Sequence, residues 1–374
     1  MLACRASFTQ RLLTNDVWRV LCGVPDMFGK LDYDGHERVV FAHDEATGLK
    51  AIIALHSTRL GPAFGGCRMW PYEDDERALT DALRLSRGMT YKAAICELPY
   101  GGGKSVIMAD PAKQKTPQLL AAMGRLVESL GGRYIIADDV GTTLADIAVM
   151  RKQTRYTAGA TNAAQARLAV TAYGVLMSMQ AAVAHRFGKA DFSGLRISVQ
   201  GLGNVGMPLC QSLREGGAEL IVADINDRRV AEAKQRFAAK GVAIEDIYSQ
   251  DADIFAPCAL GAVLNDQSIP RLRVKLICGG ANNQLYAAHH DRDLADRGIL
   301  FVPDYLASAG GVIDFYQEMI DDRPEAILQS VERIRSITRL VLESAKNSGR
   351  TALQVADRMV QQRLRAASTD EIRG

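Results

Sequence analysis

The sequence has no apolar run approaching the roughly 20 residues that a membrane-spanning helix needs, so no membrane partner is expected. Its 45 basic and 43 acidic residues leave a formal net charge of +2. So balanced a charge indicates no nucleic-acid partner. The sequence also lacks internal repeats and low-complexity tracts. With 48% hydrophobic and 24% charged residues, the 374-residue chain is typical of a globular protein of about two domains.

Cysteine is scattered along the chain, and its spacing argues against two common kinds of site. The number of cysteines, seven, is odd, and no two of them have CxxC spacing. Neither a disulfide framework nor a zinc site is indicated, and we expect no bound metal. Free cysteines suit a reducing compartment, and we expect the protein in the cytoplasm. The seven are Cys4, Cys22, Cys67, Cys96, Cys210, Cys258 and Cys278.

The first 26 residues differ from the rest in having three arginines, Arg5, Arg11 and Arg19, against two acidic residues. One interpretation is a disordered extension. Another is a start placed too early, with Met27 as the true first residue. An organelle-targeting segment is the third alternative.

Apolar periodicity in the first half of the chain predicts alternating strands and helices, as in a layered α/β domain. The turn over 43–48 joins two predicted strands, which indicates a hairpin. Glycines between 61 and 66 predict a break in the chain. In chain order the predicted elements are strands over 38–42 and 49–55, a helix from Asp74 or Asp75 to between 88 and 92, a helix from Thr116 to Gly131-Gly132, and a strand over 134–137 that leads into Asp139.

The second half is predicted to form a doubly wound parallel sheet. Small and polar residues over 158–168 predict a linker between the two halves. A strand, a glycine turn, a helix and a second strand then make a βαβ unit, and further short strands follow at regular spacing. The predicted elements are a helix over 171–186, strands over 196–200, 220–223, 254–255, 276–278 and 300–302, and a helical segment over about the last 50 residues.

A glycine motif in the second half predicts a dinucleotide site. Gly201-Leu202-Gly203-Asn204-Val205-Gly206 directly follows a predicted strand and precedes a predicted helix. Gly201 permits the tight turn, Gly203 lets a pyrophosphate approach the backbone, and Gly206 lets the helix pack on the strand. Asp224 ends the next strand, where a carboxylate binds ribose hydroxyls and repels a 2′-phosphate, so NAD is favoured over NADP. The alternative is a glycine-rich turn that binds no nucleotide.

Residues 61–105 hold the densest concentration of reactive and small side chains, including Lys92 and Lys104. Gly103-Lys104-Ser105 resembles the end of a phosphate-binding loop, but Leu98 stands where that motif needs its first glycine. Glycines and small residues beside each lysine predict room for a ligand. Two nearby cations in a dry pocket disfavour each other's charge, so the pKa of one lysine should fall toward neutrality and suit it to act as a base. The other lysine can hold a carboxylate, and Asp139 lies at a strand end, where parallel-sheet enzymes place reacting groups.

These residues resemble the glutamate/leucine/phenylalanine/valine dehydrogenase family, and most of all its leucine dehydrogenase branch. The resemblance covers roughly residues 30 to 345. It rests on seven stretches: Leu79 to Ala94, Gly101 to Lys104, Asp139 to Thr143, Ser198 to Gly206, Asp253 to Asn265, Ala281 to Leu285, and Pro303 to Tyr305 with Ala309 to Ile313.

The resemblance implies a fold of two α/β domains. Residues 1–157, joined by C-terminal helices over about 340–374, would form a substrate-binding and oligomerisation domain. Residues 165–335 would form a Rossmann domain that binds NAD. The implied reaction is oxidative deamination of an apolar, branched-chain L-amino acid to the 2-oxo acid and ammonia, and its reverse, in branched-chain amino-acid catabolism. The implied assembly is a homo-oligomer, with dimer and octamer both open.

The resemblance also implies roles for single residues. Lys92 would bind the substrate α-carboxylate with help from Asn283. Lys104 would be the general base that activates water, and Asp139 would move protons to and from the amino nitrogen. Other implied contacts are grouped by ligand: Phe64, Gly65, Met89, Ala137, Val312 and Phe315 with the substrate, and Thr171, Asn204, Val205, Ala259 and Asn282 with the cofactor.

The pocket residues leave the substrate open between two alternatives. Leucine dehydrogenases tend to be aliphatic where this chain has Phe64 and Phe315, so the two rings either narrow the pocket or stack on an aromatic substrate such as phenylalanine or tryptophan. No cation stands near Phe64 to meet a glutamate side chain. A catalytically silent NAD-binding homologue is a further alternative, against which Lys92, Lys104 and Asp139 argue. A hydroxy-acid dehydrogenase lacks support, because no histidine lies in a recognisable motif.

Overall fold

The computed structural model describes residues 29, 32–159, 164–259, 261–321 and 323–371. All helices and strands of this described part lie within residues 36–374. The expectations for residues 1–26 lie outside it. Among the described residues, no helix combines the length and the apolar character needed to cross a membrane.

The first sheet has five strands in the order β1-β2-β4-β3-β5. β1 and β2 form the predicted antiparallel hairpin, with Arg38 opposite Leu55. β4 runs antiparallel to β2 and parallel to β3, which is parallel to β5. The strands are β1 (Arg38–Asp44), β2 (Leu49–Ser57), β3 (Ala63–Trp70), β4 (Gly101–Met108) and β5 (Tyr134–Asp138).

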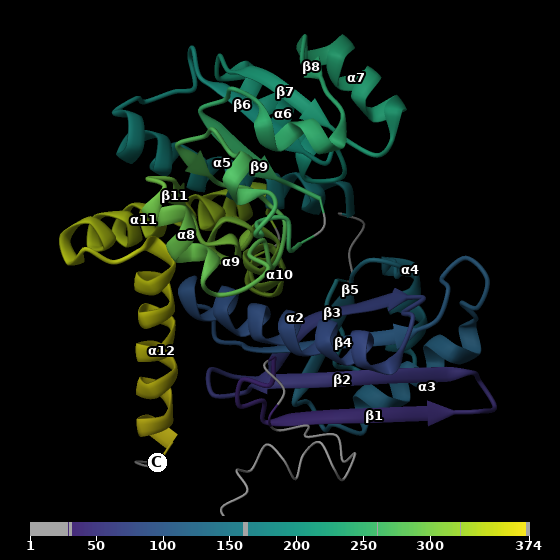
Figure 1. Cartoon of the computed structure of the whole chain (residues 1–374). Coiled ribbons are helices and arrows are strands. Elements are labelled where there is room, and N and C mark those ends of the chain that lie inside the picture. The colour runs from purple at the N-terminus through teal and green to yellow at the C-terminus, as the bar shows by residue number, and fades with distance from the viewer. Residues whose placement is uncertain (1–28, 30–31, 160–163, 260, 322, 372–374) are drawn as a thin grey trace, which may run out of the picture. The chain divides into compact units, whose positions relative to one another are not determined.

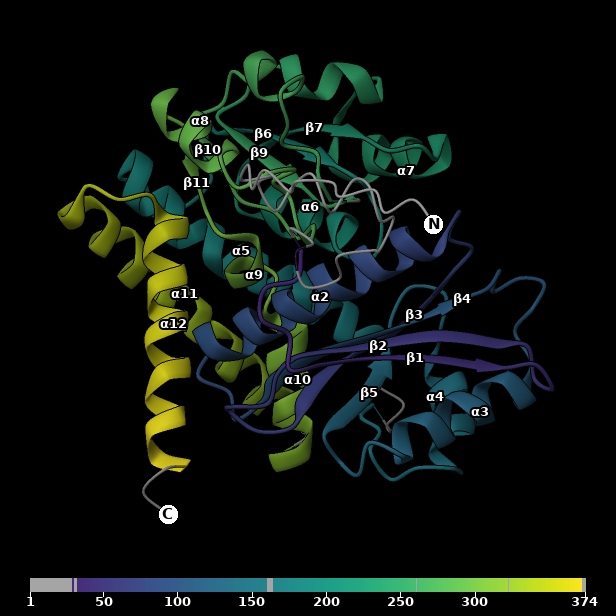
Figure 2. The same cartoon turned by 60° about the horizontal axis from the view of Figure 1, so that its bottom comes forward.

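Helices cover both faces of this sheet (Figures 1 and 2). α2 (Asp75–Ile95) packs along β4 and β2, and Asp74 caps it by accepting a hydrogen bond from the Arg77 backbone N–H. α3 (Pro117–Glu128) and α4 (Leu144–Arg151) lie on the other face over an apolar core. Thr116 caps α3, as its position before Pro117 predicts.

The predicted break is confirmed at Gly61-Pro62, which lie in the turn between β2 and β3. It is wrong at Gly65 and Gly66, because β3 runs straight through them. The strands pack too closely for side chains: a Cβ on Gly65 would lie 1.8 Å from the Gly103 carbonyl oxygen. The sequence pattern also does not predict β4, whose first three residues are glycines. A Cβ on Gly102 would lie 2.1 Å from the Thr90 backbone nitrogen of α2, so glycine is needed for helix and strand to touch.

Three predicted helix boundaries are also wrong. α2 continues past Gly88 to Ile95, because a single glycine costs a helix little when the buried face continues. α3 ends at Glu128, before the two glycines. α5 (Ala164–Phe187) begins seven residues before the predicted Thr171, so the segment after 163 belongs to the helix and not to a linker. Residues 160–163 lie outside the described part.

The second sheet has six parallel strands in the order β11-β10-β9-β6-β7-β8, the doubly wound arrangement that the sequence predicts. Alternate residues face opposite cores: Ile197, Leu220 and Ile254 belong to one, and Ile221, Phe255 and Ile277 belong to the other. The strands are β6 (Arg196–Gln200), β7 (Glu219–Ala223), β8 (Lys240–Gly241), β9 (Ile254–Pro257), β10 (Leu276–Ile277) and β11 (Leu300–Phe301).

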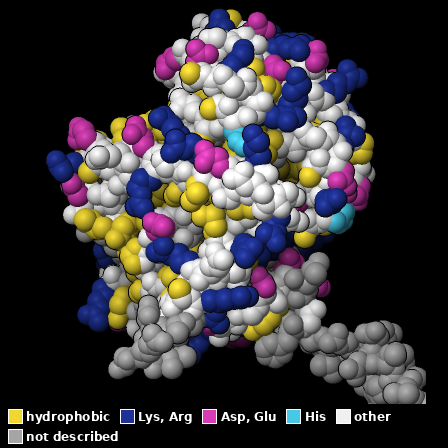
Figure 3. Space-filling view, turned by 90° about the vertical axis from the view of Figure 1, so that its left-hand side faces the viewer, with side chains coloured by type: hydrophobic (Ala, Val, Ile, Leu, Met, Phe, Trp, Pro, Cys, Tyr) yellow, Lys and Arg dark blue, Asp and Glu magenta, His cyan; other side chains and the backbone are white. Residues whose placement is uncertain are grey.

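Helices line both faces of the second sheet and complete the chain. Two short 3₁₀ helices cover part of one core, Ile244–Ser249 and Ile269–Arg271. The α-helices are α6 (Gly206–Glu215), α7 (Asp227–Phe237), α8 (His290–Asp296), α9 (Asp304–Ala307), α10 (Gly310–Ile320), α11 (Pro324–Ser348) and α12 (Ala352–Glu371). α12 packs on α11 and also on α2, where Gln361 donates a hydrogen bond to the Tyr91 hydroxyl. On the face drawn in Figure 3, basic and acidic side chains are interspersed.

Alanine substitutions at Gly102 of β4 and at Gly88 of α2 should change the free energy of unfolding in opposite directions. Gly102→Ala forces α2 away from β4 and should lower the free energy of unfolding by on the order of 2 kcal/mol or more. Gly88→Ala adds a methyl group where nothing lies within 4 Å, and should raise stability by about 0.5 to 1 kcal/mol. Urea unfolding midpoints test both. Equal midpoints for the two variants would contradict the packing argument.

Candidate active site

Lys104 and Asp139 form a buried ion pair across a strand that separates them. Lys104 lies on β4, Asp139 follows β5 directly, and β3 lies between these two strands. The Lys104 Nζ is 2.7 Å from Asp139 Oδ2, and the Lys104 side chain is only 6% exposed. The structure thus brings together the two residues that the sequence singles out as base and proton carrier.

Gly66 of β3 makes this contact possible. A Cβ at this position would lie 2.8 Å from the Asp139 Cβ and 2.7 Å from the Asp138 carbonyl oxygen. Asp139 therefore lies directly over β3. The turn that carries it is fixed by Thr142, whose Oγ1 accepts a hydrogen bond from the Asp139 backbone N–H and donates one to the Cys67 carbonyl oxygen.

The glycines beside Lys104 do not provide room for a ligand, contrary to the sequence-based interpretation. Positions around Gly102 and Gly103 are filled by Thr90 and by the Tyr134 ring. The Gly101–Lys104 run is a strand, so rejection of a phosphate-binding loop is confirmed.

Arg68 is a second cation on Asp139 that the sequence analysis does not single out. Its Nε donates to Asp139 Oδ2 at 3.0 Å and its Nη1 donates to Asp81 Oδ2 at 2.8 Å. Burial alone would raise the pKa of the Asp139 carboxyl, but the charges of Lys104 and Arg68 outweigh it and hold that pKa well below its usual range. No local sequence signal reveals Arg68, because its contact with Asp139 depends on the pairing of β3 with β5.

Lys92 projects from α2 into a separate polar cluster. Its buried Nζ donates to Asn282 Oδ1 at 2.6 Å. Burial lowers the pKa of Lys92 to about 8, opposed by the Asp304 carboxylate and assisted by the positive charge of Lys104. The expected fall in the pKa of one lysine is therefore confirmed, and the affected lysine is Lys92. In this structure Lys104 contacts a carboxylate, that of Asp139. The roles implied by the family resemblance instead give the carboxylate contact to Lys92, with the carboxylate belonging to the substrate.

The loop after β10 presents the two asparagines. Asn283 has a left-handed φ of 51°, and its carbonyl oxygen accepts from the Ala262 N–H. Gln284 anchors the loop: its backbone N–H donates to Asp304 Oδ2, and its side-chain amide donates to the Gly279 and Ala281 carbonyls. Asn282, and not Asn283, contacts Lys92. Asp304 was not singled out from the sequence, although it lies within the quoted stretch Pro303 to Tyr305.

The implied substrate-side residues gather in one apolar cluster. Phe64, Ala137 and Val312 are buried in it, and Met89 and Phe315 pack against it. The Phe64 and Phe315 ring centroids are 5.2 Å apart. Two tyrosines that the sequence analysis does not name extend this aromatic group: Tyr100, 5.7 Å from Phe64, and Tyr316, 5.8 Å from Tyr100.

The glycine turn after β6 has the geometry that its motif predicts. Gly201 has a φ of 91°, and a Cβ on Gly206 would lie 1.9 Å from the Gly201 carbonyl oxygen. A Cβ on Gly203 would meet nothing within 4 Å, so the backbone there is open to a ligand. α6 begins with Val205 as its N-cap and no side-chain cap hydrogen bond. Among the first three residues of α6, Met207 donates its N–H to the Gly203 carbonyl oxygen and Pro208 has no N–H, so the Gly206 N–H is the one that suits an anion such as pyrophosphate.

Other implied cofactor residues lie around this turn and on α5. Ala259 packs against Gly201, since a Cβ there would lie 2.8 Å from the Ala259 Cβ. Asn204 is exposed in the turn. Thr171, on α5, lies beside Gly311 at the start of α10. Asp224, 5% exposed, accepts a hydrogen bond from the Leu202 N–H at 2.6 Å and lines a surface hollow with Val242 and Ala243.

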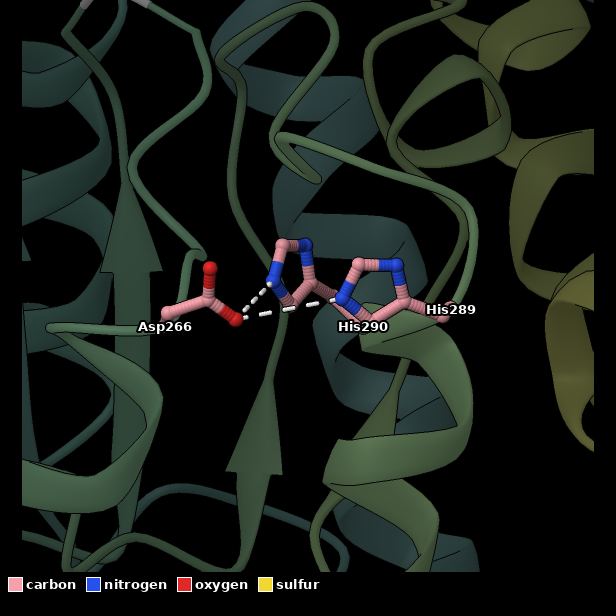
Figure 4. Close-up of side chains that lie close together, drawn as sticks. All are labelled: Asp266, His289 and His290. Atoms are coloured by element: carbon pink, nitrogen blue, oxygen red, sulfur yellow. Dashed lines mark hydrogen bonds and ion pairs between the residues drawn. The ribbon is translucent and has the colours of Figure 1, made fainter.

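Asp266, His289 and His290 are the described residues that come closest to a metal-binding group (Figure 4). His290 Nδ1 accepts a hydrogen bond from the Ala287 backbone N–H, so the proton of the neutral ring is on Nε2, which donates to Asp266. A metal on Nε2 would leave neither nitrogen protonated. This geometry argues against a metal site. It indicates instead that the hydrogen bond of His290 joins its segment to the one that carries Asp266.

Comparisons with known proteins agree with this geometry. Residues 36–156 match the dimerisation domain of Glu/Leu/Phe/Val dehydrogenases, and residues 163–228 and 218–371 match the Glutamate/Leucine/Phenylalanine/Valine dehydrogenase family. The chain belongs to the glutamate/leucine/phenylalanine/valine dehydrogenase family. It is therefore an amino-acid dehydrogenase, an oxidoreductase from a family of NAD(P)-dependent enzymes.

Individual relatives cover most of the chain. Leucine dehydrogenase of Bacillus subtilis is 46% identical over 342 residues, which are 91% of this chain and 94% of that protein. L-tryptophan dehydrogenase of Nostoc punctiforme is 45% identical over 331 residues, 88% of this chain and 94% of the relative. The crystal structure of L-tryptophan dehydrogenase from Nostoc punctiforme superposes with a TM-score of 0.75 at 43% identity, covering 90% of this chain and 97% of the other.

Gly66→Ala should separate Asp139 from Lys104 in this amino-acid dehydrogenase. The new methyl group would displace the Asp138–Asp139 backbone, and turnover should fall at least about ten-fold, a change of roughly 1.4 kcal/mol in the barrier. Steady-state rates measure the effect, and circular dichroism establishes that the variant is folded. Gly88→Ala is the matched control. A folded Gly66→Ala variant with undiminished turnover would show that the contact over β3 is dispensable.

Proposed function

We propose that the protein catalyses NAD-dependent oxidative deamination of an apolar, branched-chain L-amino acid such as leucine, and the reverse reductive amination. The observation that carries the proposal is the contact of Lys104 with Asp139 across β3, the strand on which Phe64 places its ring 5.2 Å from that of Phe315. A substrate side chain placed beside these two rings must be uncharged, because burial of a carboxylate without a partner costs several kcal/mol. The identity to a leucine dehydrogenase supports this substrate class.

We assign binding of the substrate α-carboxylate to Lys92. It is buried at the loop that carries Asn282 and Asn283, so a carboxylate beside it would meet one charge and two amide groups. Asn283 assists in this assignment. The carboxylate also supplies the negative charge that favours the protonated form of a buried lysine.

Lys104 and Asp139 carry the proton transfers in this proposal. Asp139 takes a proton from the substrate ammonium group, so that the amino nitrogen is neutral when the Cα–H bond breaks. Lys104, once neutral, takes a proton from water, and the hydroxide adds to the imine carbon. The carbinolamine then receives a proton on nitrogen from Asp139. As the C–N bond breaks, its hydroxyl group gives its proton to the Asp139 carboxylate, and ammonia and the 2-oxo acid are released. Their short contact lets the two residues exchange protons between these steps.

The residues of the second sheet fit NAD. The open backbone at Gly203 and the uncapped start of α6 suit a pyrophosphate, and bound NAD would accept the hydride from the substrate Cα. Asp224 accepts one backbone hydrogen bond on each oxygen, from Leu202 and Asn226, and keeps lone pairs for ribose hydroxyls. Its negative charge disfavours the 2′-phosphate of NADP. We assign the nicotinamide end to Thr171 and Asn282.

The proposal also covers the two domains of the chain, its assembly into an oligomer and its cellular compartment. We assign residues 1–157, with C-terminal helices over about 340–374, to substrate binding and oligomerisation, and residues 165–335 to NAD binding. The match of residues 36–156 to a dimerisation domain supports a homo-oligomer, a dimer or an octamer. The described cysteines are free and mostly buried, which supports a reducing compartment such as the cytoplasm.

The function is tested by NADH formation with a panel of L-amino acids at mildly alkaline pH. We expect turnover of leucine, valine or isoleucine with NAD, weaker turnover of phenylalanine and tryptophan because Phe64 and Phe315 narrow the cluster, and none of glutamate. NADP replaces NAD in a parallel series and should support less turnover. Preference for phenylalanine or tryptophan would instead favour the aromatic alternative. NAD binding without turnover of any amino acid would favour a silent homologue.

Lys92 should make binding of a carboxylate inhibitor depend on pH. Only its protonated form attracts a carboxylate, and its pKa of about 8 means that this form is lost as the pH rises through 8. The inhibition constant of 4-methylpentanoate, which lacks an amino group, should be constant below pH 7 and rise about ten-fold per pH unit above 8. In Lys92→Arg the constant should stay level up to pH 10, because arginine remains charged. A level profile in the unmodified enzyme would refute this role of Lys92.

A further inference from the structure

Both cations that contact Asp139 contact the same oxygen. Lys104 Nζ lies 2.7 Å and Arg68 Nε 3.0 Å from Oδ2. In the described part of the chain, both side-chain partners of the Asp139 carboxylate bind Oδ2, and the Val140 backbone N–H also donates a hydrogen bond to this carboxylate. No side-chain hydrogen bond or ion pair of the described residues uses Oδ1, which suits this oxygen to bind a ligand.

The two cations differ in how constant their charge is. Under the function proposed above, on which this inference rests, Lys104 is neutral when it takes a proton from water. Earlier in the cycle, while Asp139 is still ionised and has yet to take the ammonium proton, a neutral Lys104 does not balance the charge of Asp139. Arginine keeps its proton under all conditions that a folded protein meets. Burial works against the charge on Arg68, but Asp139 and Asp81 more than compensate and raise its pKa above its usual range.

We propose that Arg68 is a positioning residue for catalysis: it is the permanent counterion that keeps Asp139 ionised and oriented while Lys104 changes its charge. Asp139 can then exchange a proton through Oδ1 with the substrate nitrogen without turning away from the site. Nothing in the family roles described above includes Arg68.

Asp81 and Tyr72 hold the guanidinium group of Arg68 in place. The Arg68 Nη1 donates to Asp81 Oδ2, and the Tyr72 hydroxyl donates to the same oxygen at 2.5 Å. Asp81 comes from α2, Tyr72 from the segment before it, and Arg68 from β3. One planar group thus faces Asp139 with Nε and Asp81 with Nη1, which the single ammonium group of a lysine does not reproduce.

The electrostatic surroundings of Asp139 are set by groups from every element packed around it. The cations are Arg68 on β3, Lys104 on β4 and Lys92 on α2; the other titratable groups are Asp81 on α2, Tyr72 before α2, Cys67 on β3 and Tyr134 on β5. Among them, Arg68 is the one constant positive charge in contact with the carboxylate. Its loss should make Asp139 retain its proton to a higher pH.

The test compares Arg68→Gln with the matched control Arg77→Gln, in which an exposed arginine paired with Glu73 and Asp74 loses its charge. We expect Arg68→Gln to lower kcat at least 100-fold, to change the KM for leucine less than three-fold, and to move the acid limb of the kcat profile to higher pH. Arg68→Lys should restore part of kcat and of its pH profile, because lysine returns the positive charge but not the planar group that donates to two carboxylates. Arg77→Gln should match the unmodified enzyme.

Two further variants separate this inference from the proposed function and from a folding defect. Lys104→Ala should abolish turnover while NAD still binds; if it keeps its turnover, the proposed base fails whatever Arg68 does. Tyr72→Phe leaves every charge in place but removes a hydrogen bond that fixes Asp81 and through it Arg68, and it should shift the acid limb in the same direction by a smaller amount. If Lys104→Ala is inactive but folded Arg68→Gln keeps its kcat and its profile, the inference is overturned. If Arg68→Gln does not fold, an unchanged profile in folded Tyr72→Phe overturns it equally.

Discussion

The contact of Lys104 with Asp139 reaches across β3, and this requirement shapes much of the first sheet. A strand that lies between two side chains in contact needs a residue without a side chain at the point of contact. Gly66 is that residue, because a Cβ there would collide with Asp139. The same demand recurs at Gly65, Gly102 and Gly103, whose missing side chains let β3, β4, α2 and Tyr134 approach within contact distance. Glycine costs conformational entropy in a strand, so such a run is kept where close packing or a site requires it.

The fold could be predicted where short stretches of sequence determine it. The hairpin of β1 and β2, the βαβ unit around Gly201–Gly206 and the doubly wound, parallel character of the second sheet follow from local apolar patterns and one motif. The strand order of that sheet and its strand β8 were not predicted. β3 and β4 could not be predicted, because glycines are typical of turns and carry no apolar period. Only the long-range pairing of these strands, which a local pattern does not contain, turns the same glycines into strand residues.

The residues of the candidate site, like the fold, could be predicted only in part. Lys92, Lys104 and Asp139 could be found from residue type and local context. Arg68 and Asp304 could not, because their importance arises from contacts between segments far apart in sequence: Arg68 meets Asp139 through the register of β3 with β5, and Asp304 lies near Lys92 through the loop that Gln284 anchors. The prediction that two nearby lysines would differ in charge was sound physically. Which lysine loses charge depends on the carboxylate partner that each one finds.

That dependence bears on how the site works. In this structure Lys104 Nζ contacts the Asp139 carboxylate, whereas Lys92 Nζ donates to the Asn282 amide oxygen, and burial lowers the pKa of Lys92. Under the proposed function, a substrate carboxylate would give Lys92 a charged partner in contact. The substrate ammonium group would compete with Lys104 for Asp139. Binding of one zwitterion would thus favour the charged form of Lys92 and loosen the contact between Lys104 and Asp139. The amino acid itself would set the protonation state that its oxidation needs, and a substrate lacking either charged group would leave the site in its resting state.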